Sequence, residues 1–291
     1  MIKAFVPNVW AFSIAIGIDL IIGEYPNAIH PVVWMGKMVE LFNVSSESKG
    51  VKFTQGIVLL ICDGGIWFLA GIGTVMIPGI VGIILQSFLF KSTFSIRGLY
   101  SHIKKCKIDD DEKMRHEVSM IVSRDTSKLN KWHLVSAALE SLSENTSDSI
   151  TGPFFYFFLL GLPGALLYRV VNTIDAMVGY HTFQFEWFGK APARIDDVMN
   201  FIPSRLTAMF FAIFSPKKAF RSIFKYGPIK INGTYPMSAF SGVLGVKFEK
   251  IGVYEFDGRE PCLSDVDRGL RLYTFSVSVI LLFFFLLVVV R

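Results

Sequence analysis

The stretch LYTFSVSVILLFFFLLVVV, residues 272–290, contains no charged side chain and is long enough to cross a bilayer as one helix. The rest of the chain is also apolar: hydrophobic residues make up 52% of its 291 positions, 28 residues are Phe, and the mean hydropathy is +0.48. Only helices and closed barrels satisfy backbone polar groups in lipid, and long uninterrupted apolar runs favour helices. The sequence therefore predicts an all-α polytopic integral membrane protein.

The hydropathy pattern predicts about four to five membrane-embedded helical segments within a single catalytic domain that covers residues 1–291. The apolar segments are 6–22, 53–72, 74–90, 154–171, 202–214 and 272–290. The polar regions 91–151 and 215–271 are predicted to be cytoplasmic and to carry helical loops, because Lys and Arg concentrate there. A small β-hairpin is predicted within 243–256, where β-branched residues are mixed with Gly and Tyr.

Two positions in the apolar segments leave alternatives open. The turn between 53–72 and 74–90 comes from either Pro78-Gly79 or Gly71-x-Gly73. Residues 154–171 are interrupted by Gly161-Leu162-Pro163-Gly164, so they form either one kinked span or a re-entrant hairpin. Only the re-entrant form puts the acid-rich residues before this segment and the predicted loop 172–200 after it on the same side of the membrane.

The charge of the chain points to lipid and to phosphorylated substrates. The net charge is +5 and the pI about 9.0, but the basic residues cluster beside apolar segments, which fits anionic lipid better than nucleic acid. Residues 217–225 predict an amphipathic helix on the cytoplasmic membrane surface. The predicted location is therefore the cell membrane, multi-pass, with the active site facing the cytoplasm. The three cysteines indicate neither a disulfide framework nor a zinc site.

Carboxylates gather on one side of a helix predicted from about residue 130 to 148. Glu140, Glu144 and Asp148 follow one another at intervals of four, which places them along one helix face. Such charges are usually only solvated. Here the neighbouring segments are strongly apolar, and an unpaired carboxylate close to lipid or core is costly. We therefore interpret this face as part of a cation site.

Arg, Asn and Asp alternate further along the chain, within residues 168–205. Carboxylate oxygens suit Mg²⁺ and guanidinium groups suit phosphoryl oxygens, so this alternation predicts that a metal and a phosphate bind together. A Walker-type ATP site is excluded, since no Gly-x-x-x-x-Gly-Lys-Ser/Thr loop occurs. His30, which precedes Pro31, is either a proton shuttle or phosphate contact, or a histidine hydrogen-bonded inside a structural turn.

Five blocks, in order along nearly the whole chain, resemble the CobD/CbiB family of membrane adenosylcobinamide-phosphate synthases in cobalamin biosynthesis. They are Asp19-x-x-x-Gly23-Glu24-x-Pro26-Asn27-x-x-His30-Pro31-Val32-x-Trp34-Met35-Gly36, Ser123-Arg124-Asp125-Thr126-Ser127, Glu140-Ser141-Leu142-x-Glu144-Asn145-x-x-Asp148, Tyr168-Arg169-x-x-Asn172-Thr173-x-Asp175-x-Met177-Val178-Gly179-Tyr180 and Ala193-Arg194-x-Asp196-Asp197-x-x-Asn200-x-x-Pro203-x-Arg205-Leu206. The chain departs from the family where Asn-Ala-Gly-Tyr/Trp-Pro becomes Asn232-Gly233-Thr234-Tyr235-Pro236.

The resemblance implies an ATP- and Mg²⁺-dependent carbon–nitrogen ligase with ATP as co-substrate. The family joins a propionate carboxylate of the corrinoid adenosylcobyric acid to the amine of an aminoalcohol, often as its O-phosphate (aminopropanol phosphate in many members). The partners implied are these substrates, membrane lipid, and either a second copy of the chain or other membrane enzymes of the corrinoid pathway. Nucleic acid is not an expected partner.

Roles then follow from the chemistry of each side chain. The metal is assigned to Glu140, Glu144, Asp148, Asp175, Asp196 and Asp197. Catalysis, including removal of the amine proton, is assigned to Glu140, Glu144, Asp175, Asp197 and Arg194. Binding of substrate and phosphate is assigned to His30, Arg124, Asp125, Asn145, Arg169, Asn172, Asn200 and Arg205.

Two other functions compete with the ligase. An Mg²⁺-dependent intramembrane transferase of the prenyl or phospho-alcohol type also uses Asp clusters, but it needs closely spaced repeats on one helix, and Asp175 is too distant in sequence from Asp196-Asp197. A non-enzymatic membrane sensor or transporter is the other, since a related branch of the superfamily is thought to signal. The dense set of Arg, Asp and Asn residues favours retained chemistry.

Overall fold

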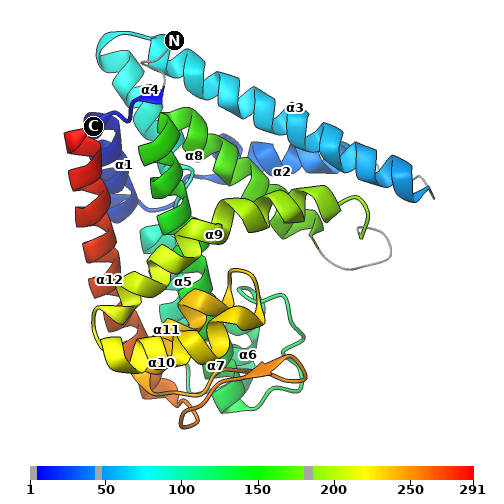
Figure 1. Cartoon of the computed structure of the whole chain (residues 1–291), viewed down its shortest axis with the longest axis vertical. Helices are drawn as coiled ribbons and strands as arrows, with labels where there is room; N and C mark the ends of the chain where they lie inside the picture. The colour runs from blue at the N-terminus through cyan, green and yellow to red at the C-terminus, as the bar shows by residue number, and fades with distance from the viewer. Residues whose placement is uncertain (1–4, 43–47, 180–185) are drawn as a thin grey trace. The chain divides into compact units, whose positions relative to one another are not determined.

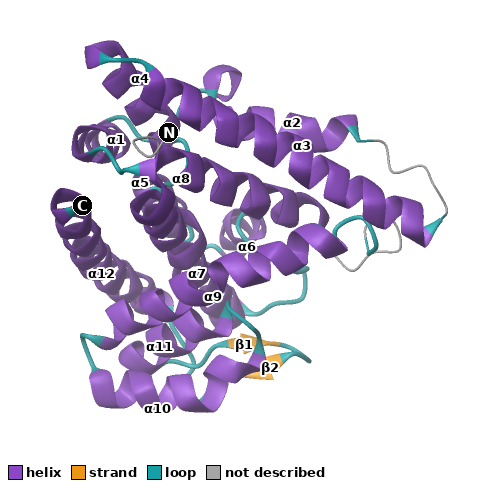
Figure 2. Cartoon of the chain, turned by 45° about the horizontal axis from the view of Figure 1, so that its top comes forward, coloured by secondary structure: helices purple, strands orange, loops and turns teal. Residues whose placement is uncertain are grey.

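A computed structural model describes residues 5–42, 48–179 and 186–291 of the protein. Helices dominate the described residues, and four of them are long and apolar enough to cross a membrane (Figure 2). These are Lys49–Met76, Gly79–Lys105, Lys131–Val178 and Leu263–Val290, and a shorter apolar helix covers Val9–Ile21. The predicted all-α polytopic membrane architecture is confirmed.

The chain divides into two compact units, each assembled from separate stretches of sequence. One unit comprises Met1–Ser95, Gly152–Asn200 and Phe283–Arg291, and the other comprises Ile96–Thr151 and Phe201–Leu282. The sequence predicts a single domain, since no linker or change of composition marks a boundary between the two units. Two of the boundaries fall inside helices. These helices are α9 (Lys190–Ala212) and α12 (Leu263–Val290).

Aromatic rings form the core of the first unit. Its helices, drawn in Figure 1, are α1 (Val9–Ile21), α2 (Pro31–Leu41), α3 (Lys49–Met76), α4 (Gly79–Lys91), α8 (Gly152–Val178) and the first part of α9. The rings of Phe90 and Phe157 stack with centroids 3.9 Å apart, and Phe12 meets Phe154 edge to face at 5.2 Å. Such ring pairs add to the stability of the fold beyond the contribution of the apolar area that they bury. Between α3 and α4 the chain turns at Pro78-Gly79, the first of the two predicted alternatives.

Helix α8 folds back on itself at Gly161. This residue has φ +64°, in the region that glycine adopts most readily, and Pro163 follows two positions later. The rings of Tyr156 and Tyr168, one on each arm, stack with centroids 5.2 Å apart. A Cβ on Gly152 would lie 2.2 Å from the Tyr168 ring. A straight helix would hold Gly152 and Tyr168 more than about 20 Å apart. The segment thus folds back as a hairpin rather than forming one kinked helix, and its re-entry into the membrane stays a prediction.

Close backbone contact holds the second arm of α8 against α3. A Cβ added at Gly71 would lie 2.8 Å from Pro163 Cα, whereas a Cβ at Gly73 would meet nothing within 4 Å. We expect Gly71→Ala to lower the free energy of unfolding by about 1–3 kcal/mol through overpacking. Gly73→Ala is the matched control and should raise it by about 0.5–1 kcal/mol through helix propensity. Denaturant titration of both variants in detergent tests this, and equal stabilities would contradict the packing.

The second unit is built around a buried helix, α7 (Lys131–Thr146), in which every residue from Leu134 to Ser143 is buried. The unit also contains α5 (Ile96–Lys105), α6 (Asp111–Ser119), a π-helical turn (Ser147–Thr151), α10 (Pro216–Tyr226), a 3₁₀ turn (Gly227–Ile229), α11 (Thr234–Leu244) and most of α12. Strands β1 (Glu249–Lys250) and β2 (Tyr254–Glu255) pair antiparallel and form the predicted hairpin (Figure 2). Helix α10 is amphipathic, as predicted, with Ala219 buried and Phe224 79% exposed, and its place on the membrane surface stays a prediction.

The prediction of a loop over residues 172–200 is wrong. Helix α8 continues to Val178 and α9 begins at Lys190, so most of this range is helical. The polar composition of this range suggested a loop. In the structure, Asp196 accepts hydrogen bonds from Asn172 on α8 and from Asn200 on α9, so these polar side chains have partners within helices.

Candidate functional site

Two helices of the first unit bring together the acidic residues of the last two blocks. Asp175 lies on α8, and Asp196 and Asp197 lie on α9. Asn172 Nδ2 donates to Asp196 Oδ1 at 3.4 Å, and Asn200 Nδ2 donates to Asp196 Oδ2 at 3.0 Å. Both oxygens of Asp196 are therefore oriented by amides. We refer to these five residues as the carboxylate–amide group.

A buried tyrosine fixes the orientation of this group. The hydroxyl of Tyr168, whose side chain is fully buried, donates to Asn200 Oδ1 at 2.6 Å. The Asn200 carbonyl oxygen is thus the acceptor, and its NH₂ must point at Asp196. Asn200 is itself only 2% exposed, so this chain of hydrogen bonds lies away from water, where a satisfied network is rigid.

The electrostatics of the carboxylate–amide group favour a bound cation. Burial raises the pKa of Asp196, and the neighbouring charge of Asp175 raises it further, against the lowering effect of the amide hydrogen bonds. Burial also raises the pKa of Asp197, which the charge of Arg194 opposes. Carboxylates held together in this way repel each other until a cation or a proton arrives.

The donor set fits Mg²⁺ shared with a phosphate better than a closed metal cage. Among the residues that the structure describes, no three His, Cys, Asp or Glu side chains are placed to hold an ion by themselves. Mg²⁺ commonly uses one or two carboxylates together with waters and substrate phosphates. Arg194 stands at the edge of the group, 71% exposed and 3.7 Å from Asp197 Oδ2, and Arg169 Nη1 donates to Asn172 Oδ1 at 3.4 Å. Arg194 therefore lies beside a carboxylate, and Arg169 is linked to Asp196 through the Asn172 amide.

In the second unit, Glu140 is the centre of a separate network. Ser136 Oγ donates to its Oε1 and Tyr254 OH to its Oε2, each at 2.6 Å, and Arg124 pairs with the same Oε2. The network also holds β1, since Glu249 N donates to Ser136 Oγ at 3.0 Å. Both oxygens of Glu140 are already engaged, an arrangement that positions α7, the Arg124 segment and the hairpin. Its assignment to the metal stays a prediction.

Glu144 lies one turn further along α7, within the electrostatic range of two lysines for which the sequence predicts no role. The charges of Lys230 and Lys250 both act on the Glu144 carboxylate. Lys230 Nζ lies 5.3 Å from the centroid of the Tyr254 ring. Burial lowers the pKa of Lys250, and the positive charges of Lys230 and Arg124 lower it further. The one hint in the sequence is that Lys230 stands two residues before the Asn232 motif.

The other predicted residues of the second unit contact nearby backbone groups or aromatic rings. Asp125 accepts from Ser127 N at 2.8 Å and closes its own turn. Asn145 Nδ2 donates to the Ser141 carbonyl at 2.9 Å.

The Arg205 guanidinium lies over the rings of Phe201 and Tyr235, at 3.5 and 4.0 Å from their centroids. Asp148 is partly buried in the π-helical turn, and Tyr180 of the fourth block lies outside the described residues.

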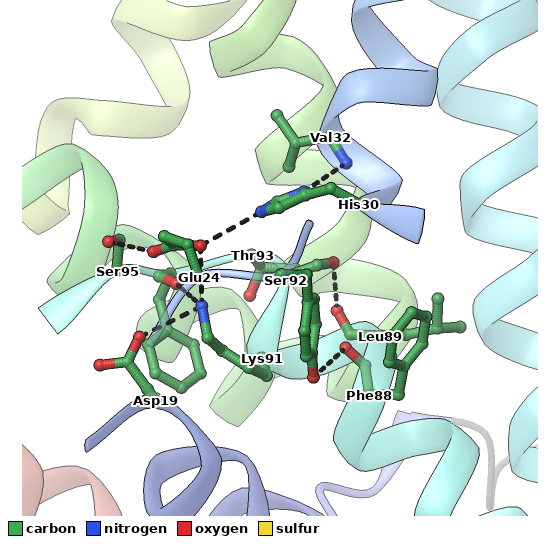
Figure 3. Close-up of polar contacts among 12 residues, drawn as sticks. Asp19, Glu24, His30, Val32, Phe88, Leu89, Lys91, Ser92, Thr93 and Ser95 are labelled. Atoms are coloured by element: carbon green, nitrogen blue, oxygen red, sulfur yellow. Dashed lines mark hydrogen bonds and ion pairs between the residues drawn. The ribbon is translucent and has the colours of Figure 1, made fainter. Parts of the chain in front are cut away.

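His30 belongs to a third network, shown in Figure 3, that contains a fully buried lysine. Lys91 Nζ lies 3.2 Å from Asp19 Oδ1 and 3.0 Å from Glu24 Oε2, and Lys91 and Asp19 are both 0% exposed. His30 Nδ1 accepts from Val32 N at 3.2 Å and caps α2, and its Nε2 lies 3.2 Å from Glu24 Oε2. Both ring nitrogens are thus used, which matches the structural-turn alternative for His30.

This network makes stability depend on pH. Burial raises the pKa of Glu24, but the hydrogen bond with His30 and the charge of Lys91 lower it more, to about 2 from an ordinary 4.5. The unfolded chain takes up this proton near pH 4.5 and the folded protein only near pH 2, so the contribution is complete above 4.5 and is lost as the pH falls. Between these values, the wild-type unfolding free energy should fall more steeply than that of Glu24→Gln. Equal slopes in denaturant titrations would contradict this.

Comparison with known proteins finds one family over most of the chain. A family model described as CobD/Cbib protein matches residues 12–276. A probable cobalamin biosynthesis protein CobD of Pyrococcus furiosus is 44% identical, with 92% of this chain and 95% of that protein covered. The cobalamin biosynthesis protein CobD of Dehalococcoides mccartyi is 39% identical (93% and 91% covered), and a probable one of Methanocaldococcus jannaschii is 38% identical (89% and 91%). No solved structure matches significantly.

Proposed function

Since this chain belongs to the CobD/CbiB family, we propose that it acts in cobalamin biosynthesis as an ATP- and Mg²⁺-dependent ligase. It would join a propionate carboxylate of adenosylcobyric acid to the amine of an aminoalcohol or its O-phosphate, and so form adenosylcobinamide or its phosphate. Location in the cell membrane, with the site open to cytoplasmic ATP, is part of the same proposal.

The observation that carries this proposal is the carboxylate–amide group. Asp196 is held by two amides, and its neighbour Asp175 has the same charge. A protein gains no stability from carboxylates placed together in this way, so the arrangement is best explained by a cation that binds there. When bound, Mg²⁺ would neutralise charge on the phosphates of ATP. Asp175, Asp196 and Asp197 are the residues that would hold it.

The proposed reaction needs no covalent bond to the protein, but it needs charged groups positioned around the phosphates. The corrinoid carboxylate attacks the γ-phosphorus of ATP, ADP leaves, and an acyl phosphate results. The amine then attacks the acyl carbon, phosphate leaves, and the ammonium proton passes to a carboxylate. Arg194, next to Asp197, and Arg169, next to Asn172, would hold phosphoryl oxygens, since fixed cations stabilise the charge that develops in phosphoryl transfer.

A ligation assay with the purified full chain in detergent tests the proposal. ADP release should require Mg²⁺, adenosylcobyric acid and an aminoalcohol phosphate together, with one amide formed per ATP consumed. Transfer of a prenyl or phospho-alcohol group without ATP would support the transferase instead. Corrinoid binding without ATP consumption would support the sensor. Substituting ethanolamine, aminopropanol and their phosphates for one another would identify the amine.

A further inference from the structure

Two lysines, Lys230 and Lys250, are near enough to Glu144 for their charges to act on its carboxylate. Glu140 already has its counter-ion in Arg124, and Tyr254 and Ser136 occupy its oxygens as well. Lys230 and Lys250 therefore add two positive charges to a place where one carboxylate, Glu144, is left to balance them. Lys250 also lies close enough to Lys230 and Arg124 for their charges to act on it. Like charges gathered at a partly buried site suit a ligand that carries the opposite charge.

Four separate segments supply this cluster. Lys230 precedes α11, Lys250 is on β1, Arg124 precedes α7, and Glu144 is on α7. The hairpin is held to α7 by the contacts of Glu140 and Ser136, so Lys250 is held in place with it. Arg124 Nη1 donates to the Glu249 carbonyl at 3.0 Å, which orients the guanidinium beside the same strand. The cations are therefore preorganised, which lowers the cost of binding an anion.

Glu144 brings a negative charge to the edge of this positive cluster. A Cβ on Gly233 would lie 2.2 Å from Glu144 Oε1, so the backbone of the Asn232 motif approaches the carboxylate directly. A simple phosphate site would gain nothing from a carboxylate, which repels the anion. A ligand that carries an ammonium group a few bonds from its phosphate would satisfy both kinds of charge.

We propose that Lys230, Lys250 and Glu144 bind a phosphorylated amine, with the phosphate on the two lysines beside Arg124 and the ammonium on Glu144. This assigns the aminoalcohol phosphate of the proposed ligation to the second unit, and it rests on that proposed function for the ligand's role. Glu144 accepts the ammonium N–H here rather than a metal.

Binding of O-phosphoethanolamine to the full chain in detergent, without ATP or corrinoid, tests the charge pattern. Lys230→Gln and Lys250→Gln should each weaken it about 10- to 100-fold, the effect of one charge-assisted hydrogen bond. Glu144→Gln should weaken phosphoethanolamine but leave inorganic phosphate unchanged or bound more tightly. Lys225→Gln, which removes an exposed lysine paired with Asp257, is the control and should change neither. If Glu144→Gln weakens both ligands alike, or the lysine variants bind normally, the proposal is wrong.

A measurement on the wild-type protein covers the case in which a variant does not fold. Acetic anhydride labels lysines, and mass spectrometry reports the extent at each one. Phosphoethanolamine should protect Lys230 and Lys250 and leave Lys225 unprotected. Protection by ATP but not by phosphoethanolamine would assign the site to the nucleotide and overturn the proposal.

These tests separate this inference from the ligase itself. Binding needs neither ATP nor corrinoid, so it is measurable even if the ligation assay fails. If ligation proceeds and the lysine variants keep the wild-type KM for the amine, the ligase stands and this site assignment falls.

Discussion

Asp175→Asn is expected to lower kcat/KM for ATP-dependent ligation about 10²- to 10³-fold without lowering the unfolding temperature. Loss of one preorganised charged group at the reacting phosphates typically costs this much. Stability should hold or rise, because the charge of Asp175 repels Asp196 in the absence of a cation. A side chain that served only the fold would show the opposite pattern.

Steady-state kinetics at several Mg²⁺ concentrations measure the predicted loss of activity, and thermal unfolding measures the predicted stability. Half-saturation by Mg²⁺ should move to higher concentration in Asp175→Asn. Asp257→Asn, which removes an exposed carboxylate paired with Lys225, is the control and should match wild type in both assays. Undiminished ligation by Asp175→Asn would remove this carboxylate from the proposed metal site.

Lys91→Met is expected to be the most destabilising single change, by about 3–5 kcal/mol. Lys91 is fully buried between Asp19 and Glu24, so its removal leaves the equally buried Asp19 carboxylate without its counter-ion. The ammonium group also lies 5.3 Å from the centroid of the Tyr25 ring, a favourable contact that would be lost.

Denaturant unfolding in detergent, with two comparison variants, checks the origin of this effect. Lys107→Met removes an exposed lysine paired with Asp267 and should cost no more than about 1 kcal/mol. Asp19→Asn added to Lys91→Met should recover part of the loss, because it removes the uncompensated charge. A small effect of Lys91→Met, similar to that of Lys107→Met, would contradict the buried triad.

Local patterns account for what could be predicted. Hydropathy is a property of neighbouring residues, so the stretch 272–290 was enough to predict its helix and the membrane class. Helix capping is equally local: Asp is a preferred N-cap residue, and Asp110 Oδ1 accepts from the N–H groups of Glu112 and Lys113. The alternation of charge with Phe and Ile in 217–225 predicted α10 for the same reason.

Which side chains meet was beyond any local pattern. Tyr254 and Glu140 are 114 positions apart, and Lys91 and Glu24 are 67 apart, yet each pair makes a direct contact. The spacing of Glu140 and Glu144 correctly placed both on α7. It gave no sign that hydrogen bonds enclose Glu140 while the charges of two lysines act on Glu144.

The sequence by itself determined the membrane class, the helices and the kinds of side chain available for chemistry, because these depend on residues near one another in the chain. Tertiary structure alone decided that α8 turns back at Gly161, that two amides hold Asp196, and that Lys230 and Lys250 share a cluster with Glu144. The reason is physical. A charge or an amide acquires its function from the partner that packing brings within a few ångströms, and packing joins residues that the chain keeps far apart.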